Sequence, residues 1–388
     1  MHLIGNLMGL NKELDGILVV SLEQAVAAPY CGLLLADAGA RVIKIERPTG
    51  DFSRAYDSSI NGHSAIFAWL NRGKESICLN LKNYEDIQTI QAILTKADIF
   101  LSNLAPGAVT RMGLDGKTLR LSNPELITCS ITGYGESKKA TAMKAYDFLV
   151  QAESGVCAAT GTKNNPSRVG VSLTDLSSGL TAFSAILRAL IQRNSTGRGI
   201  DLSVSMFDVM ADWMNMNLLA HRYMGGAPER TGLQHGFIAP YGAFNCKNEE
   251  QVLLSIQNNR EWAEFCSFVL QQPELIDDIR FCNNPERFNN RVELDALVNK
   301  CFSKYDKKAV IKLLDKASIA NATLNSVADL SNHPFLKNAV AQTGGKEISF
   351  AALPIHTVAI SPNEVPTLGQ HSNSIKTEFS CHSDLKQN

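Results

Sequence analysis

The feature that most constrains the fold is a regular alternation of strand-like and helix-like runs at the start of the chain. GILVVSL (16–22) is rich in β-branched residues, and AAPYCGLLLADAGA (27–40) is typical of a helix that ends at Gly39. RVIKIE (41–46) then alternates like a strand. This strand–helix–strand order predicts parallel strands joined by a crossover helix.

The alternation continues to about residue 135, through the strand-like runs SICLNL, DIFLSNL and ELITCSITGYG and the helical run YEDIQTIQAILTKA. We therefore expect one doubly wound α/β unit there. Two helical stretches follow, at 175–193 and 206–224. From about residue 225 a loop rich in Gly and Pro leads into a smaller second region, and the tail from 345 has short strand-like runs and prolines.

Composition excludes several classes of protein. The 388 residues are 45% apolar and 19% charged, with a formal net charge of −1, so no global field attracts nucleic acid or an acidic membrane. No apolar run approaches the roughly 20 residues of a membrane span. The amino-terminal stretch does not resemble a signal peptide. Nine cysteines without a C-x-x-C pair fit a reducing cytoplasm and favour neither a zinc site nor a disulfide framework.

Several catalytic and cofactor-binding motifs are absent. The first strand is followed by EQAVAAPYCG rather than G-x-G-x-x-G, which removes the main reason to expect a nicotinamide cofactor. There is no phosphate-binding G-x-x-x-x-G-K-[ST] loop, no H-E-x-x-H helix and no G-x-S-x-G elbow. These absences disfavour P-loop enzymes, zinc proteases and α/β-hydrolases.

A lone carboxylate stands out in RVGVSLTDLSSG (168–179). Asp175 lies among small and apolar neighbours, directly before the helix-like run LTAFSAILRALI. It could cap that helix, because an Asp before a helix accepts hydrogen bonds from its free N–H groups. It could equally be a carboxylate kept partly out of water for chemistry. Spacing alone favours the cap.

Seven segments in order resemble the family III CoA-transferases, a group that also contains the α-methylacyl-CoA racemases. They are GILVVSLEQAVAAPYCGLLLADAGARVIKIERPTGD, LNRGKESICLNLK, NLAPGAVTRMGL, AYDFLVQAESG, TGRGIDLSVSMFDV, PYGAF and PTLGQHS. The resemblance implies an α/β fold with a Rossmann-like large domain built from both chain ends and a smaller α+β domain. We expect 1–224 to be the first part of the large domain, 225–344 the linker and small domain, and 345–388 the return. It also implies a homodimer of interlocked rings.

The resemblance favours a catalytic role for Asp175 over that of a helix cap, because Asp175 matches the family's nucleophilic aspartate. Its carboxylate would attack an acyl-CoA thioester and form first an anhydride and then an aspartyl-CoA thioester. N–H groups at the start of the helix would stabilise the ionised form of Asp175 and fix the orientation of its carboxylate. CoA and acyl-CoA would act as substrates, no cofactor would be tightly bound, and no metal, nucleic acid or membrane is expected as a partner.

Tyr146 separates the transferases from the racemases within this resemblance. The racemases have an acid–base His at its position, whereas the ordinary pKa of Tyr, about 10, suits proton removal at neutral pH poorly. A racemase-like enzyme and a non-catalytic CoA-binding protein remain alternatives, and the presence of Asp175 argues against the second. A purely structural Tyr146, packed in the core with its hydroxyl group in a hydrogen bond, is also an open alternative.

The remaining site residues follow from matched segments. Those expected to contact CoA are Arg47, Leu70, Asn71, Lys74, Asn103, Leu104, Arg111, Lys144 and Tyr146. A guanidinium fork suits phosphate, although for Arg47 and Arg111 a solvated loop arginine is the alternative. NLAPG puts Ala105 where formate-type members often have a cation, which disfavours oxalate–formate specificity. Several segments instead resemble members acting on C4–C5 dicarboxylates such as succinate, itaconate, mesaconate and citramalate.

A dicarboxylate substrate keeps one free carboxylate when its other end is joined to CoA. Burying that charge unpaired would cost several kcal/mol, so the site needs a cation or a set of N–H donors. The available candidates are Arg72, Arg168 and His235. A partly exposed loop histidine is the simpler interpretation of His235, and a solvated charge that of Arg168.

Overall fold

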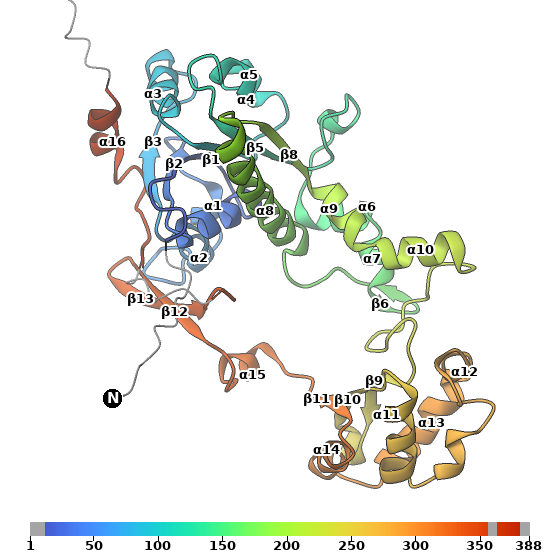
Figure 1. The fold of residues 1–388 in the computed structure, drawn as a ribbon. Coiled ribbons are helices and arrows are strands. Elements are labelled where there is room, and N and C mark those ends of the chain that lie inside the picture. Colours follow the sequence, from blue (N-terminus) through green and yellow to red (C-terminus); the bar gives the residue numbers. More distant parts are fainter. Residues whose placement is uncertain (1–11, 356–362, 381–388) are drawn as a thin grey trace, which may run out of the picture. The chain divides into compact units, whose positions relative to one another are not determined.

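The computed structural model describes residues 12–355 and 363–380 (Figure 1). The chain divides into two units. The first combines 1–156, 169–215 and 337–388, and the second combines 157–168 and 216–336. The divisions therefore fall near 215 and 336 rather than at 224 and 344, and a short hairpin at 157–168 joins the second unit. The amino-terminal residues interpreted as lacking a signal peptide lie largely outside the described ranges.

The first unit contains a six-stranded sheet in which every strand is parallel to its neighbours, in the order β3-β2-β1-β4-β5-β8. Its strands are β1 (Leu18–Leu22), β2 (Arg41–Glu46), β3 (Glu75–Cys78), β4 (Ile99–Ser102), β5 (Ile127–Thr132) and β8 (Asp201–Ser205). The expected α/β class is confirmed. The order reverses between β1 and β4, and in such sheets ligands bind outside the carboxyl ends of the strands at that point.

Helices cover both faces of this sheet, as the continuous apolar runs of its strands require. Neighbouring strand residues point to opposite faces: Val19 packs in a core with α1 and α8, and Val20 in a core with α3 and α16. The helices of this unit are α1 (Ala27–Asp37), α2 (Ala65–Asn71), α3 (Tyr84–Leu94), α4 (Ala108–Arg111), α5 (Gly116–Leu119), α6 (Asp147–Glu153), α8 (Leu173–Thr196), α9 (Met206–Trp213) and α16 (Ser372–Phe379), with short 3-10 turns η1 (Phe52–Ala55) and η2 (Ala140–Ala142).

Helices α1 and α8 lie side by side on one face of the sheet (Figure 1). A Cβ atom at Gly179 would lie 2.5 Å from the carbonyl oxygen of Ala27, so only glycine permits this approach. Asp175 lies one turn before Gly179 along α8. The first turns of α8 therefore pack against the start of α1, which follows directly from the carboxyl end of β1.

The carboxyl-terminal part of the first unit contains the short strands expected from residue 345 and, in addition, a helix that was not expected. It holds the hairpin β12 (Asn338–Thr343) and β13 (Lys346–Ala351), the short β14 (Asn363–Glu364), and helix α16. The helix expected at 206–224 is also wrong as a single element, since α9 ends at Trp213 and α10 (Asn215–Tyr223) follows it.

The second unit has its own apolar core and an antiparallel sheet in the order β11-β10-β9. Its strands are β6 (Gly161–Thr162), β7 (Asn165–Pro166), β9 (Tyr241–Asn245), β10 (Gln251–Ser255) and β11 (Ala320–Ala322). Its helices are α11 (Asn259–Glu264), α12 (Asn284–Asn289), α13 (Arg291–Phe302), α14 (Lys307–Lys316) and α15 (Val327–Ser331), with the π-helix η4 (Phe265–Leu270) and the 3-10 turns η3 (Lys247–Glu249) and η5 (Pro273–Ile276). Helices α7 (Val156–Ala159) and α10 each cross a boundary between the first and the second unit.

Candidate active site

The loop after β1 is held at the point where the strand order reverses. The side-chain amide of Asn103, just beyond β4, accepts a hydrogen bond from Gln24 N at 3.0 Å and donates one to Gln24 O at 2.8 Å. The next residue, Ala25, has a positive φ of 63°, a strained conformation for a residue with a Cβ atom. Ala25 N donates to Asp51 Oδ1 at 3.2 Å. Asn103 and Asp51 thus fix this loop from both sides.

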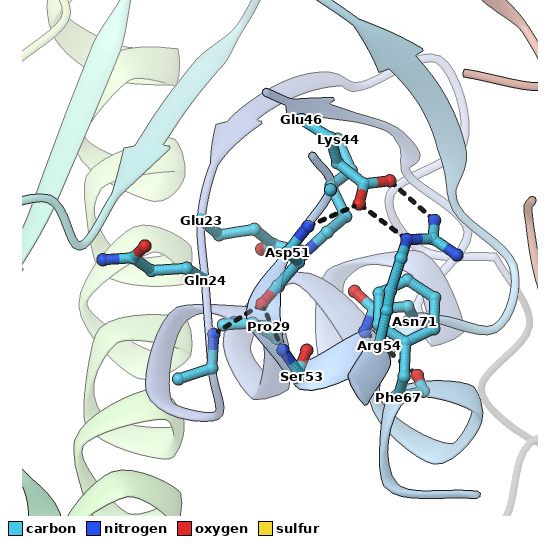
Figure 2. A network of polar contacts seen from close by, with 12 residues as sticks. Glu23, Gln24, Pro29, Lys44, Glu46, Asp51, Ser53, Arg54, Phe67 and Asn71 are labelled. Carbon is cyan, nitrogen blue, oxygen red and sulfur yellow. Dashed lines mark hydrogen bonds and ion pairs between the residues drawn. The ribbon is translucent and has the colours of Figure 1, made fainter. Parts of the chain in front are cut away.

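A buried network of ions lies behind that loop (Figure 2). Lys44 Nζ lies 2.8 Å from Asp51 Oδ2 and 3.3 Å from Glu23 Oε1, while Lys74 Nζ lies 2.5 Å from Glu23 Oε1. All four side chains are fully buried. Gly32 makes room for them, because a Cβ atom there would lie 2.8 Å from a Glu23 carboxylate oxygen. Two positive and two negative charges compensate one another.

The pKa values in this network follow from burial and pairing. Burial acts to raise the pKa of Glu23, but Lys74 and Lys44 lower it below its usual value. Burial lowers the pKa of Lys74 to about 8 against the opposing effect of Glu23. Loss of one partner would leave a buried charge unpaired, at a high cost in free energy. The four side chains are therefore held in place and support the loop rigidly.

Three residues expected at CoA belong to this interior. Lys74 Nζ also donates to Pro29 O at 2.9 Å and to Asn71 Oδ1 at 3.1 Å, so its three donors are all used within the protein. Asn71 Nδ2 donates to Phe67 O at 3.0 Å, and Leu70 is fully buried. These side chains support the site from inside, and a contact between their segment and CoA stays a prediction.

Helix α8 carries Asp175 in its first turn, as the third helical residue. The N-cap is Ser172, whose side chain makes no capping bond. The cap comes instead from Asp147, whose Oδ1 accepts from Thr174 N at 2.8 Å and from Asp175 N at 3.3 Å. The interpretation of Asp175 as the cap is therefore wrong. The helix N–H groups expected to keep it ionised are directed to Asp147.

Asp175 is only partly exposed, and burial together with the negative charge of Asp147 raises its pKa to about 7. Such a carboxylate is partly ionised near neutral pH and more basic than an ordinary one, which suits nucleophilic attack on an acyl group. The charge of Asp175 also acts on Tyr56, whose pKa is raised by burial and by Asp51, Asp175 and Tyr146. Tyr56 therefore belongs to the surroundings of Asp175.

Sequence reasoning missed Gln24, Tyr56 and Asp147 at this site. Asp147 lies next to Tyr146 in AYDFLVQAESG, one of the seven segments that resemble the family, and its place in that segment is the signal in the sequence that could have indicated it. Tyr146 itself is 66% exposed and forms the N-cap position of α6 without a side-chain capping bond.

The other expected CoA residues differ in what they present to solvent. Arg47, Arg111 and Lys144 are exposed, and Arg47 Nε donates to Gly50 O at 2.9 Å. Leu104 lines a cavity of about 280 Å³ at the carboxyl ends of β4 and β5, together with Ser102 and Thr132. Three cations and one cavity of the first unit are thus accessible to a phosphorylated ligand.

The three candidates for a free substrate carboxylate lie in different settings. Arg72 is buried, donates to Trp69 O at 2.6 Å and stacks 4.5 Å from the ring centre of Phe350. Arg168 is exposed and belongs to the second unit.

His235 lines a cavity of about 340 Å³ in the second unit. It stacks on Tyr241, its Nδ1 accepts from Phe237 N at 3.1 Å, and burial and Arg291 lower its pKa. A neutral imidazole held in this way has Nε2–H as its remaining donor.

Within the described ranges, no group of three or more His, Cys, Asp or Glu side chains is arranged to hold a metal ion. A search of the same residues finds no helix long and apolar enough to cross a membrane.

The fold and site define a class: an α/β protein of Rossmann-like strand order with a carboxylate pair at a helix N-terminus. Comparison with known proteins makes this specific. The model of CoA-transferase family III matches residues 14–372, and the chain belongs to this family. It is therefore a CoA-transferase, an enzyme that exchanges CoA between an acyl-CoA thioester and a carboxylic acid.

Named relatives have related activities. The chain is 35% identical to acetyl-CoA:oxalate CoA-transferase of Acetobacter aceti, over 95% of this chain and 96% of that protein. It is 32% identical to mouse succinyl-CoA:glutarate CoA-transferase, over 95% and 86%. It is 28% identical to succinyl-CoA:mesaconate CoA-transferase of Haloarcula marismortui, over 94% and 96%.

A solved structure confirms the fold. The crystal structure of a CAIB/BAIF family protein from Brucella suis superposes with a TM-score of 0.80 at 30% identity, covering 95% of this chain and all of that one. The resemblance stated from sequence segments alone is confirmed.

Proposed function

We propose that Asp175 is the nucleophile of this CoA-transferase and that its acceptor is a small dicarboxylate. The observation that carries the first part is the partly buried Asp175 carboxylate, held in the first turn of α8 beside Asp147 with its pKa raised to about 7. A carboxylate suits the reaction because it forms anhydrides and thioesters that another carboxylate can reverse.

The proposed reaction has four acyl-transfer steps. The Asp175 carboxylate attacks the thioester carbonyl of the donor, the C–S bond breaks, and CoA leaves as a thiolate. The thiolate then attacks the aspartyl carbonyl of the mixed anhydride, which releases the donor acid and leaves CoA on Asp175 as a thioester. The acceptor carboxylate displaces this thiolate to form a second anhydride. Attack of the thiolate on the acceptor's acyl carbonyl releases acceptor-CoA and free Asp175.

The CoA site in this proposal is the carboxyl edge of the sheet, where the strand order reverses. The exposed cations Arg47, Arg111 and Lys144 are the candidates for its phosphates, since guanidinium and ammonium groups pair with phosphate oxygens. The Leu104 cavity is the candidate for an uncharged part of CoA. CoA acts here as a substrate, without a tightly bound cofactor.

Trapping the covalent intermediate tests the nucleophile. With succinyl-CoA, borohydride should reduce an aspartyl thioester, and mass spectrometry should place the reduced residue at Asp175. Asp175→Asn keeps the side-chain shape but is a far poorer nucleophile, so exchange should fall by roughly a thousandfold or more. Glu153→Gln, an exposed carboxylate change at the end of α6, is the control. A reduced residue elsewhere, or near-native exchange in Asp175→Asn, would refute the mechanism.

The dicarboxylate part of the proposal is supported by the relatives, whose names specify oxalate, glutarate and mesaconate as acceptors. Its chemical requirement is a donor for the free carboxylate. The candidates stay Arg72, which is buried against Phe350, the exposed Arg168, and His235, which lines a cavity of the second unit with Nε2–H unused by its backbone contact.

An acceptor panel tests the substrate class. With succinyl-CoA as donor, we expect glutarate, mesaconate and itaconate to exceed butyrate and carnitine in kcat/KM. His235→Ala should raise KM for a dicarboxylate by about tenfold, the equivalent of one lost hydrogen bond to a charged group. His221→Ala, an exposed histidine on α10, is the control. A monocarboxylate that wins in wild-type enzyme would show that the substrate class is wrong.

We also propose that the protein is a cytoplasmic homodimer of interlocked rings. Leu180 and Ile191 are 49% and 71% exposed and lie three turns apart on the same stripe of α8, which supports a covering partner. The eight described cysteines are free thiols, which supports a reducing compartment. Interlocked rings separate only on unfolding, so a folded monomer at high dilution in analytical ultracentrifugation would contradict this arrangement.

A further inference from the structure

The N-terminus of α8 is held by side chains of a different helix. Asp147, the first residue of α6, is buried, and its Oδ1 accepts from both Thr174 N and Asp175 N. Thr174 Oγ1 also donates to Asp147 O at 3.4 Å. Because Ser172 makes no capping bond, the position of Asp175 depends on a residue 28 positions earlier in the chain.

Gln151, one turn further along α6, adds two hydrogen bonds that fix the start of α8. It is fully buried, its Nε2 donates to Asp147 Oδ2 at 2.8 Å, and its Oε1 accepts from Val169 N at 2.9 Å. One face of α6 therefore binds the segment that leads into α8 at two places, before and after its entry into the helix. This arrangement fixes the direction in which the first turn presents Asp175.

The charge of Asp147 matters as well as its shape. The negative charge of Asp147, which accepts a hydrogen bond from the backbone N–H group of Asp175, repels the Asp175 carboxylate while Asp175 is ionised. Acylation of Asp175, as an anhydride or a thioester, removes its charge and with it the repulsion. A second carboxylate in its surroundings thus raises the energy of the resting nucleophile and not that of the covalent intermediates.

We propose that Asp147 is a positioning residue for the transfer reaction, holding the first turn of α8 and keeping the Asp175 carboxylate reactive by like-charge proximity. This rests on the proposed function of Asp175. Gln151 serves the same role through Asp147. The raised pKa of Asp175, to about 7, agrees with this effect.

Other ionisable groups near Asp175 set the background for a test. Tyr56 and Tyr146 lie close enough for their charges to interact, and Asp51 acts on Tyr56. Tyr56 is neutral across the acid range because its pKa is raised, and although burial acts to raise the pKa of Asp51, the paired Lys44 lowers it below its usual value. Asp147 is thus the group whose neutralisation most directly changes the titration of Asp175.

The test compares pH profiles. Asp147→Asn removes the charge and keeps an acceptor oxygen for the helix N–H groups, so the acid limb of kcat/KM should move down by about one pH unit. The single-turnover rate of aspartyl-CoA formation at high pH should fall about tenfold, because a less basic carboxylate is a weaker nucleophile. Asp147→Glu keeps the charge, so its acid limb should stay near that of wild type while misplacement lowers the rate.

Asp306→Asn is the matched control. Asp306 also caps a helix, α14, by accepting from Ala309 N at 2.7 Å, but it lies in the second unit. Its variant should leave the pH profile unchanged. If wild type is active and the midpoint of the acid limb of kcat/KM in Asp147→Asn lies within about 0.3 pH unit of the wild-type midpoint, the positioning role is overturned. The two carboxylates would then not interact.

A second readout does not need activity. Infrared difference spectra between each enzyme and its Asp175→Asn counterpart report protonation of the Asp175 carboxyl directly. A lower midpoint in the Asp147→Asn background supports the inference even if wild type proves inactive with CoA donors. An unchanged midpoint overturns it even if transfer activity is confirmed. The inference and the proposed function can therefore fail separately.

Discussion

At the scale of the residue, the candidate site contains a carboxylate whose surroundings disfavour its charge. Asp175 is partly buried, lies beside Asp147 and has a pKa of about 7 in place of an ordinary aspartate value. Between about pH 4 and pH 7 the folded state therefore binds a proton that the unfolded state releases. The free energy of unfolding falls as pH rises through this window, the opposite of a salt-bridged aspartate.

Asp175→Asn should consequently be more stable than wild type at high pH. Near pH 3 the two proteins should unfold alike, because both side chains are neutral in the folded state and in the unfolded state. Near pH 8 the variant should gain up to about 4 kcal/mol, the linkage value of a pKa raised from 3.8 to about 7. Urea titrations at the two pH values measure this difference, and equal stability at both would contradict the raised pKa.

Asn103 is a second residue whose chemistry is specific. Its amide both accepts from and donates to the backbone of Gln24, and only an amide side chain of this length does both. Asn103→Asp loses the donor and should raise KM for CoA substrates several-fold while costing about 1–3 kcal/mol of stability. The comparison is Asn123→Asp, since Asn123 donates to Leu94 O and Ala97 O away from the site. That variant should lose stability alone, and a similar KM change in both would refute the role of Asn103.

At the scale of the element, helix α16 and the residues before it close the edge of the sheet at β3. His371 Nδ1 accepts from Ser76 N at 3.1 Å, Ser372 Oγ accepts from Cys78 N at 3.0 Å, and His371 N donates to Ser76 O at 2.9 Å. An edge strand with free N–H groups is prone to pairing with other chains. The carboxyl-terminal segment thus accepts hydrogen bonds from β3 with side chains, where a further strand would use its carbonyl groups, and donates one from its backbone.

His371→Ala should cost about 1–3 kcal/mol, because it leaves Ser76 N without its acceptor. His371→Asn places a side-chain oxygen near the position of Nδ1 and should recover most of that loss. Chemical denaturation of the three proteins measures both differences. Equal losses in the two variants would show that packing of the ring, and not the hydrogen bond, holds the segment.

At the scale of the whole molecule, the two units have separate apolar cores. Phe302 is fully buried in the core of the second unit and contacts Phe244 and Phe265 edge-on. Phe302→Ala should destabilise that unit by about 3–5 kcal/mol through a cavity. Hydrogen exchange should rise in β9 and β10 and stay unchanged in β1, β2 and β4.

Phe335→Ala, which removes an 86% exposed ring, should change neither pattern. Faster exchange throughout the first unit in Phe302→Ala would instead show that the two cores unfold together as a single cooperative unit.

Local patterns in the sequence were sufficient for the parallel α/β class and for the strands of the first 135 residues, and the ordered motifs of the family resemblance led to the proposal of Asp175. Alternation, turn residues and ordered motifs are properties of neighbouring positions, so they can be recognised without coordinates. Local patterns failed where a helix boundary depends on packing. The break between α9 and α10 and the presence of α16 in the tail are examples.

Tertiary structure decided which polar groups are buried and what pairs with them. Lys44 and Lys74 look like ordinary lysines in RVIKIE and LNRGK, yet both are fully buried against Glu23, and the three donors of Lys74 are all used within the protein. Asp147 and Asp175 are 28 residues apart, and only the packing of α6 against the start of α8 joins them. Burial and charge pairing across such separations set the pKa of a carboxylate, because desolvation and Coulomb interactions depend on distance in space and not along the chain.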